Sequence, residues 1–138
     1  QKSSGYGSVI AIFVKRALEG KPLIVYGDGN QTRDYQYVED VVRSYKLSMT
    51  IPAGEVINTG FGKDYSINDI AKTIIELTNS KSKIVHADPR PGEVKKLQSN
   101  VEKIKKFGHV NNYTLRQGLK KYIEWVTKYD FDSLGLMK

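Results

Sequence analysis

The chain has 138 residues, of which 39% are hydrophobic and 27% charged, which is typical of a water-soluble protein with one moderate core, either a single domain or part of a larger one. It has no run of eighteen apolar residues and no secretory leader at its start, so we expect no membrane association and a cytoplasmic location. The sequence contains no cysteine, which excludes disulfides and thiolate nucleophiles, and two histidines are too few for a histidine metal site. We therefore expect no metal.

The formal charge of +7 would suit nucleic acid, an acidic membrane surface or a small phosphorylated ligand. Several lysines gather between positions 95 and 106, but the alternating arginines and aromatic residues of a nucleic-acid reader do not accompany them. We interpret this cluster as a solvated face and expect no nucleic-acid partner.

The first half of the chain predicts two helices and two strands. Apolar residues recur with helical spacing over 8–18, and a Gly-Lys-Pro sequence ends that helix before a short strand at 23–26. The sequence "EVINTG" at 55–60 reads as a buried strand that ends at a glycine turn. Between these two strands, the helical spacing of the apolar residues Val38, Val41, Val42 and Tyr45 predicts a helix over 38–49.

Two later helices carry N-terminal capping signals. Ser66 and Asp69 have the spacing of a capping box, and so do Thr114 and Gln117. The apolar residues that follow each box have helical periodicity. The core stripe of the first of these helices consists of Ile67, Ile70, Ala71, Ile74 and Leu77.

The other elements of the second half are shorter. Residues 83–86 predict a brief strand, and Asn100 can cap a short helix over 101–107. Between them, residues 88–99 contain two prolines and a glycine, so we expect an extended loop there. The end of the chain, 130–138, is expected to fray.

Two arginines are predicted to lie in loops. Arg33 follows the turn signal Gly-Asp-Gly and precedes a helix, and Arg90 lies in "DPRPGEV". Loops on a rigid scaffold commonly present residues to ligands, and the guanidinium fork matches phosphate oxygens in geometry. The alternative is that each arginine only pairs with a nearby acid, Arg33 with Asp34 or Asp40 and Arg90 with Asp88 or Glu93.

Five blocks occur in a specific order: "SVIAIF", "GKPLIVYGDGNQTRDYQYVEDVV", "VINTGFGKDYSINDIA", "DPRPGEV" and "LRQGLKKYIEWV". Together they resemble the C-terminal half of NAD-dependent nucleotide-sugar epimerases and dehydratases of the extended short-chain dehydrogenase/reductase family, nearest to the UDP-glucose 4-epimerase group. The resemblance covers roughly residues 5–127. It implies an α/β fold of several helices and short strands that lacks most of the Rossmann sheet, with a substrate-binding portion over 1–129.

In that family the N-terminal half holds NAD and the catalytic pair Tyr-x-x-x-Lys. No tyrosine in this sequence has a lysine four positions later, and no glycine run has the dinucleotide fingerprint. We therefore expect NAD in the parent enzyme only, with no catalytic and no cofactor-binding residues in this chain. The chain alone should be inactive.

The resemblance also implies a set of nucleotide-sugar contacts. Arg33 and Arg90 match the family's two phosphate-contacting arginines, and Glu93 stands where the family commonly has an aspartate that accepts hydrogen bonds from ribose hydroxyls. The strand positions that hold a pyrimidine base match Ile24 and Tyr26, and the helix start that closes over base and phosphate matches Val9 and Ile10. The implied partner is a UDP-sugar or another pyrimidine nucleotide-sugar.

Two alternatives stay open at this point. The chain could be a stand-alone or truncated binding or assembly module without activity, or a fragment of a 4,6-dehydratase. Its start in mid-motif without a methionine favours a fragment. In the family, the strand matching 55–60 and the helix matching 38–49 pack on the missing half, so we expect an uncovered strand edge, an uncovered apolar helix face and self-association. Base identity, sugar identity and reaction type depend on the absent half.

Overall fold

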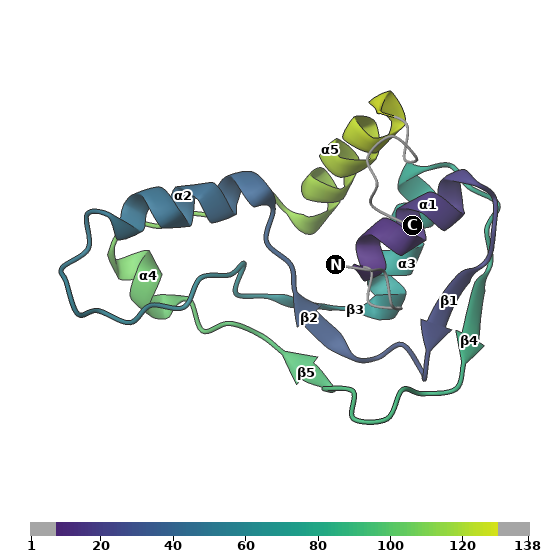
Figure 1. Ribbon diagram of the computed structural model, residues 1–138, viewed down its shortest axis with the longest axis horizontal. Helices are drawn as coiled ribbons and strands as arrows, with labels where there is room; N and C mark the ends of the chain where they lie inside the picture. The colour runs from purple at the N-terminus through teal and green to yellow at the C-terminus, as the bar shows by residue number, and fades with distance from the viewer. Residues whose placement is uncertain (1–7, 130–138) are drawn as a thin grey trace.

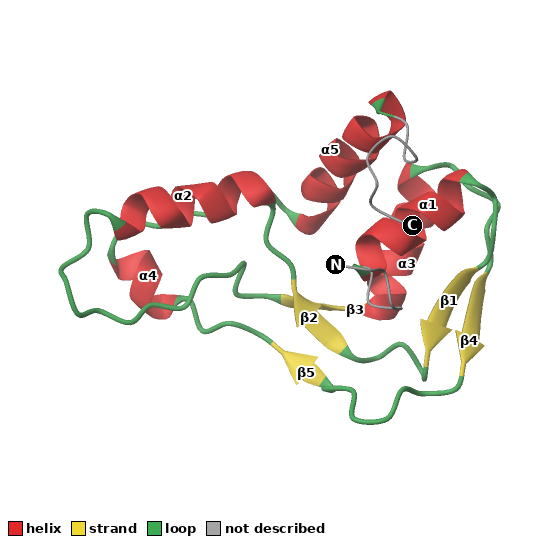
Figure 2. Cartoon of the chain, viewed as in Figure 1, coloured by secondary structure: helices red, strands yellow, loops and turns green. Residues whose placement is uncertain are grey.

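The computed structural model describes residues 8–129, which form an α/β fold with five helices and two small sheets (Figures 1 and 2). The α/β expectation is confirmed. In chain order the elements are α1 (Val9–Leu18), β1 (Leu23–Tyr26), β2 (Thr32–Asp34), α2 (Val38–Ser48), β3 (Asp64–Ser66), α3 (Ile67–Leu77), β4 (Ile84–Ala87), β5 (Lys96–Leu97), α4 (Glu102–Lys106) and α5 (Leu115–Lys128).

The main lobe is built on a parallel pair of strands. Strand β1 pairs with β4 in register from Leu23 opposite Ile84 to Tyr26 opposite Ala87. Helices α1 and α3 pack against each other and against β1, and α5 packs on α3 (Figure 1). The apolar faces of these elements meet in one core, which consists of Phe13, Val14, Ala17, Leu23, Val25, Ile67, Ile70, Ala71, Ile74, Leu119, Ile123 and Val126.

The two capping-box predictions are confirmed. Ser66 and Thr114 both form complete capping boxes, in which the side chain of the third helical residue bonds back to the cap. The prediction for Asn100 is not met in the same way: the N-cap of α4 is Val101, without a side-chain cap bond, although the Asn100 side-chain oxygen accepts a hydrogen bond from the backbone N–H of Glu102 at 3.0 Å. These bonds join residues two or three positions apart, so the local sequence is enough to predict them.

A second sheet corrects the prediction that Arg33 lies in a loop. Arg33 is the middle residue of β2, which lies between β3 and β5 in a three-stranded sheet. Its register partners are Tyr65 in the antiparallel β3 and Leu97 in the parallel β5. Strand β5 lies within the segment 88–99, which the prolines had marked as loop. Arg33 is therefore held by backbone pairing on both sides.

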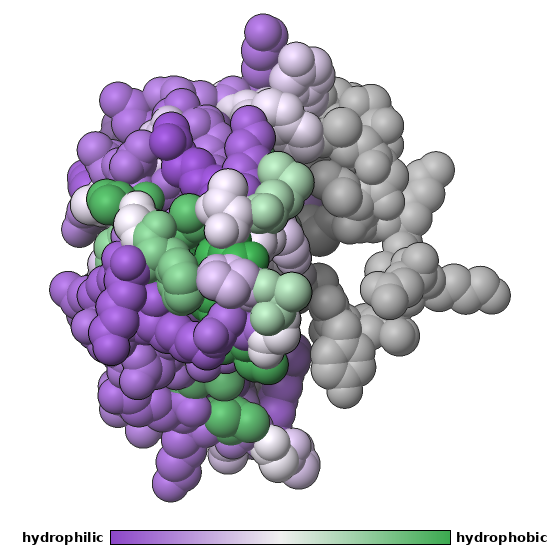
Figure 3. Space-filling view, turned by 90° about the vertical axis from the view of Figure 1, so that its left-hand side faces the viewer, coloured by the Kyte–Doolittle hydropathy of each residue, from purple (hydrophilic) through white to green (hydrophobic). Residues whose placement is uncertain are grey.

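Helix α2 and the short α4 lie at the end of the molecule away from the main lobe (Figure 1). The buried face of α2 is polar: Asp40 and Ser44 are 0% and 1% exposed. Its outward face carries Val38, Val42 and Tyr45, and Met49 follows directly after it, with exposed fractions between 46% and 80%. The expectation of an uncovered apolar helix face is confirmed, and Figure 3 shows apolar side chains among hydrophilic ones at this end of the molecule.

The predicted buried strand at 55–60 is wrong. These residues form no strand, and Val56 is 83% exposed. A strand needs a neighbour for its backbone groups, and no strand of residues 8–129 pairs with this segment. Side chains hold the segment instead: Lys103 donates to the Val56 carbonyl at 2.9 Å and Asn111 to the Gly60 carbonyl at 3.0 Å. Just after the segment, the Asp34 carboxylate accepts hydrogen bonds from the backbone N–H groups of Phe61 and Gly62 at 2.8 and 2.9 Å. The expected uncovered strand edge is therefore wrong as well.

The predicted fraying at 130–138 lies outside the described residues. Among the helices of residues 8–129, none combines the length and the apolar character that crossing a bilayer requires.

Candidate functional site

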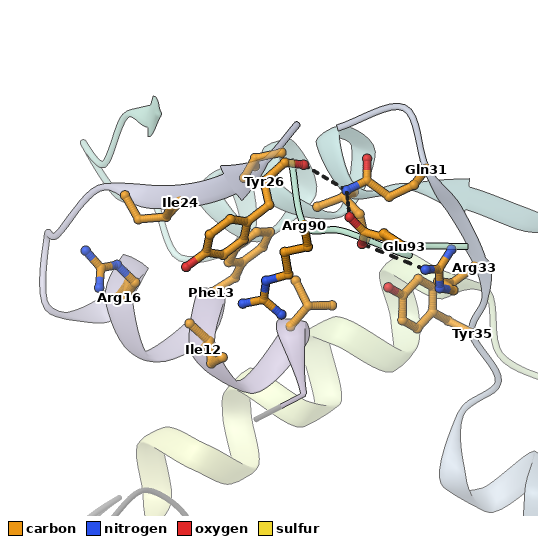
Figure 4. A pocket seen from close by; sticks show the side chains of 13 residues that line it. Ile12, Phe13, Arg16, Ile24, Tyr26, Gln31, Arg33, Tyr35, Arg90 and Glu93 are labelled. Carbon is orange, nitrogen blue, oxygen red and sulfur yellow. Dashed lines mark hydrogen bonds and ion pairs between the residues drawn. The ribbon is translucent and has the colours of Figure 1, made fainter. Parts of the chain in front are cut away.

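A cavity of about 360 Å³ lies between α1, the end of β1, β2 and the loop that carries Arg90 (Figure 4). Six of the seven residues predicted to bind substrate line it, namely Val9, Ile24, Tyr26, Arg33, Arg90 and Glu93. These residues come from four separate segments of the chain, and the fold brings them together.

Ile10 is the exception. It lines a different, apolar groove of about 550 Å³, together with residues of α5 such as Leu119 and Trp125. Successive residues of a helix point about 100° apart, so Val9 and Ile10 cannot both face the same cavity. The structure therefore separates these two predicted contacts.

Helix α1 contributes one full face to the cavity. Val9, Ile12, Phe13 and Arg16 have the spacing i, i+3, i+4 and i+7, which places them along one side of a helix (Figure 4). Sequence analysis did not single out Arg16, although continuing the helical period from Val9 leads to it. The Arg16 side chain donates a hydrogen bond from Nε to the carbonyl of Pro22, which ties the end of α1 to the start of β1.

Arg90 and Glu93 reach the cavity from one tight turn. Pro91 and Gly92 occupy its two central positions, Gly92 has φ of +74°, and the Glu93 N–H donates to the Arg90 carbonyl at 3.4 Å. Proline followed by a glycine with positive φ is the pattern of a type II turn. Such a turn brings its first and last residues close together, so both side chains can serve one ligand.

The Arg90 guanidinium lies over the Tyr26 ring, 4.0 Å from its centroid. Within residues 8–129, its side chain forms no hydrogen bond and no ion pair. The alternative interpretation, in which Arg90 pairs with Asp88 or Glu93, is therefore wrong. The stacking leaves the N–H groups of the guanidinium available to a ligand.

Arg33 is held more firmly. Its Nη1 donates to the carbonyls of Thr32 and Val94 at 2.8 and 2.7 Å, and its Nη2 lies 3.8 Å from Oε1 of Glu93. The alternative partners do not face it, because the carboxylates of Asp34 and Asp40 accept backbone N–H groups elsewhere. Arg33 thus has both a structural role and one guanidinium nitrogen directed toward the cavity.

Gln31 and Tyr35 also line the cavity, and sequence analysis did not predict either. Gln31 lies two residues before Arg33, in the same sequence block, "GKPLIVYGDGNQTRDYQYVEDVV". Burial raises the pKa of the Tyr35 phenol, and the nearby Arg33 acts in the opposite direction. The phenol therefore stays protonated near neutral pH and can only donate or share its proton in a hydrogen bond.

The charges around the cavity favour an anionic ligand. Its lining includes three guanidinium groups, from Arg16, Arg33 and Arg90, against one carboxylate, from Glu93. The other lining residues are mostly apolar or aromatic, including Phe13 and Ile24. A cavity with this lining can bind a flat ring beside a group that carries about two negative charges.

Residues 1–60 match the model of the NAD dependent epimerase/dehydratase family. The chain is 37% identical to UDP-N-acetyl-alpha-D-glucosaminuronate decarboxylase from Bacillus cytotoxicus over 95% of its own length. It superposes on the crystal structure of UDP-glucose 4-epimerase with UDP-glucose from Thermotoga maritima with a TM-score of 0.86, 36% identity and 93% coverage of this chain. The chain is thus similar over most of its length to members of the NAD dependent epimerase/dehydratase family.

Other members of the family catalyse different reactions. The chain is 32% identical to dTDP-glucose 4,6-dehydratase from Salmonella typhimurium over 89% of its length. It spans 43% of the decarboxylase, 38% of the dehydratase and 42% of the epimerase. The names of all three include a pyrimidine nucleoside diphosphate sugar, whereas the reactions differ.

Residues 8–129 do not provide a cradle for the dinucleotide. The Gly27-Asp28-Gly29 turn follows β1 but leads into β2, and no helix begins there. Dinucleotide phosphates bind where a glycine-rich turn passes directly into a helix N-terminus. The part of the chain described here therefore does not fit NAD.

Proposed function

We propose that this chain is the nucleotide-sugar-binding part of an NAD-dependent epimerase of the UDP-glucose 4-epimerase type. The dinucleotide and the catalytic tyrosine and lysine would lie on another part of a longer protein. The observation that carries the proposal is the cavity that brings Arg33, Arg90 and Arg16 together beside Tyr26 and Glu93.

In this proposal the pyrophosphate lies between Arg33 and Arg90. Both guanidiniums have N–H groups not used by the fold, and both line the cavity, Arg90 beside Tyr26 and Arg33 beside Glu93 (Figure 4). The pyrimidine base packs against the side chains of Ile24 and Tyr26, and Val9 closes the cavity from α1. The role of the chain is binding and orientation, since charge-assisted hydrogen bonds would fix the phosphates and apolar packing would hold the base.

A second candidate is the corresponding part of a nucleotide-sugar 4,6-dehydratase. The 32% identity to dTDP-glucose 4,6-dehydratase supports it. The two candidates share the same nucleotide contacts and differ in the chemistry at the sugar, which the rest of the protein would supply. A non-catalytic binding module is the third possibility, and binding of a nucleotide-sugar without turnover by the complete natural protein would favour it.

The test of the binding proposal is calorimetric titration of the 138-residue chain at fixed salt. We expect UDP to bind about a hundredfold more tightly than uridine, because two arginines each contribute a charge-assisted bond to the phosphates. UMP should lie between the two. Equal affinities for UDP and uridine, or no binding of UDP, would contradict a pyrophosphate site between Arg33 and Arg90.

The apolar face of α2 supports a proposal of self-association. Acidic residues occupy its first turn and Lys46 its last, so two copies packed antiparallel would place Glu39 of one copy near Lys46 of the other. The exposed Val38, Val42 and Tyr45 would lie between them. We propose that the 138-residue chain forms a dimer through this face.

Sedimentation velocity tests the dimer. At high micromolar concentration we expect a dimer for the wild-type chain, and a monomer for the double variant Val42→Lys, Tyr45→Lys, because the new positive charges repel each other across the interface. The matched control is Val56→Lys, Val110→Lys, at two exposed valines outside α2, which should stay dimeric. A monomeric wild-type chain would rule out this interface.

A further inference from the structure

The side chain of Gln31 connects two parts of the cavity wall. Its Nε2 donates to the carbonyl of Tyr26 at 2.9 Å and to Oε2 of Glu93 at 3.3 Å (Figure 4). Both neighbours are acceptors only, so the amide nitrogen must face them. The backbone of Gln31 is fixed as well, because its carbonyl accepts the N–H of Ile67 at the start of α3 at 3.2 Å.

The Glu93 carboxylate is therefore held from two sides. Gln31 bonds to Oε2, while Nη2 of Arg33 lies 3.8 Å from Oε1. The type II turn that begins at Arg90 fixes the Glu93 backbone. Its side chain is still 30% exposed and lines the cavity, so its oxygens have lone pairs left for a ligand.

A carboxylate in this position restricts what can lie next to it. It repels phosphate oxygens, and as a carboxylate it can only accept hydrogen bonds. The ligand group beside Glu93 must therefore be a donor, although the neighbouring Arg33 and Arg90 attract an anion. In a nucleoside diphosphate, the donors nearest to the pyrophosphate are the two ribose hydroxyls.

We propose that Gln31 is a positioning residue for ribose recognition. With Arg33, it holds the Glu93 carboxylate where both its oxygens can accept from the ribose diol, and it thereby sets the preference for nucleotides that carry those hydroxyls. The inference rests on the proposed function, since it requires the nucleotide to occupy this cavity. It assigns a role to a side chain that need not touch the ligand.

The test compares UDP with 2′,3′-dideoxy-UDP by calorimetric titration. The wild-type chain should prefer UDP by tenfold or more, about what loss of a hydrogen bond to a charged group produces. In Gln31→Met, which keeps the length of the side chain but has no donor, the preference should fall to about threefold or less. Gln31→Glu should lower it further because a second carboxylate repels Glu93.

Three variants separate positioning from a general structural effect. Glu93→Ala should remove the preference, and adding Gln31→Met to it should change the preference no further, because both act on the same contact. Arg90→Ala should weaken both nucleotides by the same factor and leave their ratio unchanged. Asn30→Ala, in the same turn but bonded only to Asp28, should behave like wild type. Thermal melting would confirm that each variant is folded.

The possible results point to different conclusions. If wild type binds UDP but does not distinguish it from the dideoxy nucleotide, Glu93 does not accept from the ribose and the inference is wrong, while the proposed function stands. If the preference exists but survives in both folded Gln31 variants, Gln31 does not position Glu93. If wild type binds neither nucleotide, the proposed function itself fails.

Discussion

Replacing Arg90 with alanine is expected to weaken UDP binding by about 1.5 to 3 kcal/mol, or roughly tenfold to more than a hundredfold. The stability of the fold should hardly change. Within residues 8–129 the Arg90 side chain forms no hydrogen bond or ion pair and lies over the face of the partly exposed Tyr26 ring, and such an exposed cation–π contact contributes about 0.5 to 1 kcal/mol. Calorimetric titration with UDP and thermal melting together measure the two effects.

Arg33→Ala should lower both affinity and stability. The same side chain bonds to the Thr32 and Val94 carbonyls and so fastens β2 to the segment before β5. We expect a comparable loss of UDP affinity and an additional loss of about 1 to 3 kcal/mol in the free energy of unfolding. Lysine at either position should restore affinity only in part, because it cannot form a two-pronged contact with phosphate.

The double variant gives the sharper test of the clamp. Two arginines that bind one pyrophosphate should show losses in UDP affinity that are not additive. Arg116→Ala is the matched control, since Arg116 is an exposed arginine on α5 that pairs with Glu76 at 2.7 Å. Unchanged UDP affinity in Arg90→Ala, with the control behaving normally, would remove Arg90 from the phosphate site.

Asp40→Ala is expected to produce the largest loss of stability, about 3 kcal/mol in the free energy of unfolding. The Asp40 carboxylate is fully buried and accepts the backbone N–H groups of Asn112 and Tyr113 at 3.0 and 3.1 Å. It also lies 3.8 Å from the Nε of Arg43. Alanine would remove the shared acceptor of these two part-buried N–H groups and detach the segment before α5 from α2.

Urea denaturation followed by circular dichroism measures this effect. A loss of this size should lower the denaturation midpoint by about 1 to 3 M, given the usual dependence of stability on urea. Asp40→Asn, which keeps one carbonyl-type acceptor, should lose less. The control is Glu124→Ala. The Glu124 carboxylate is 62% exposed and forms a loose ion pair with Lys120 at 4.0 Å, so its removal should change stability little. An Asp40→Ala variant as stable as this control would contradict the role assigned to the carboxylate.

The sequence by itself determined the features that depend on near neighbours. The capping boxes at Ser66 and Thr114 form as predicted because each one joins residues three positions apart. Pro91 and Gly92 define the turn that presents Arg90, since proline limits φ and glycine accepts a positive one. The order of the five sequence blocks also indicated the family, and six of the seven predicted contact residues lie on one cavity.

Only the tertiary structure decided the features that need a partner distant in sequence. Residues 55–60 have the apolar character of a strand but form none, because no strand of residues 8–129 lies beside them to accept their backbone hydrogen bonds. Arg33 lies in β2 because β3 and β5, some thirty and sixty positions away, pair with it. The link from Gln31 to Glu93 spans 62 positions and follows no local pattern. Helical and turn signals act over a few residues, whereas strand pairing and the shape of a binding cavity depend on contacts that the chain makes only when it is folded.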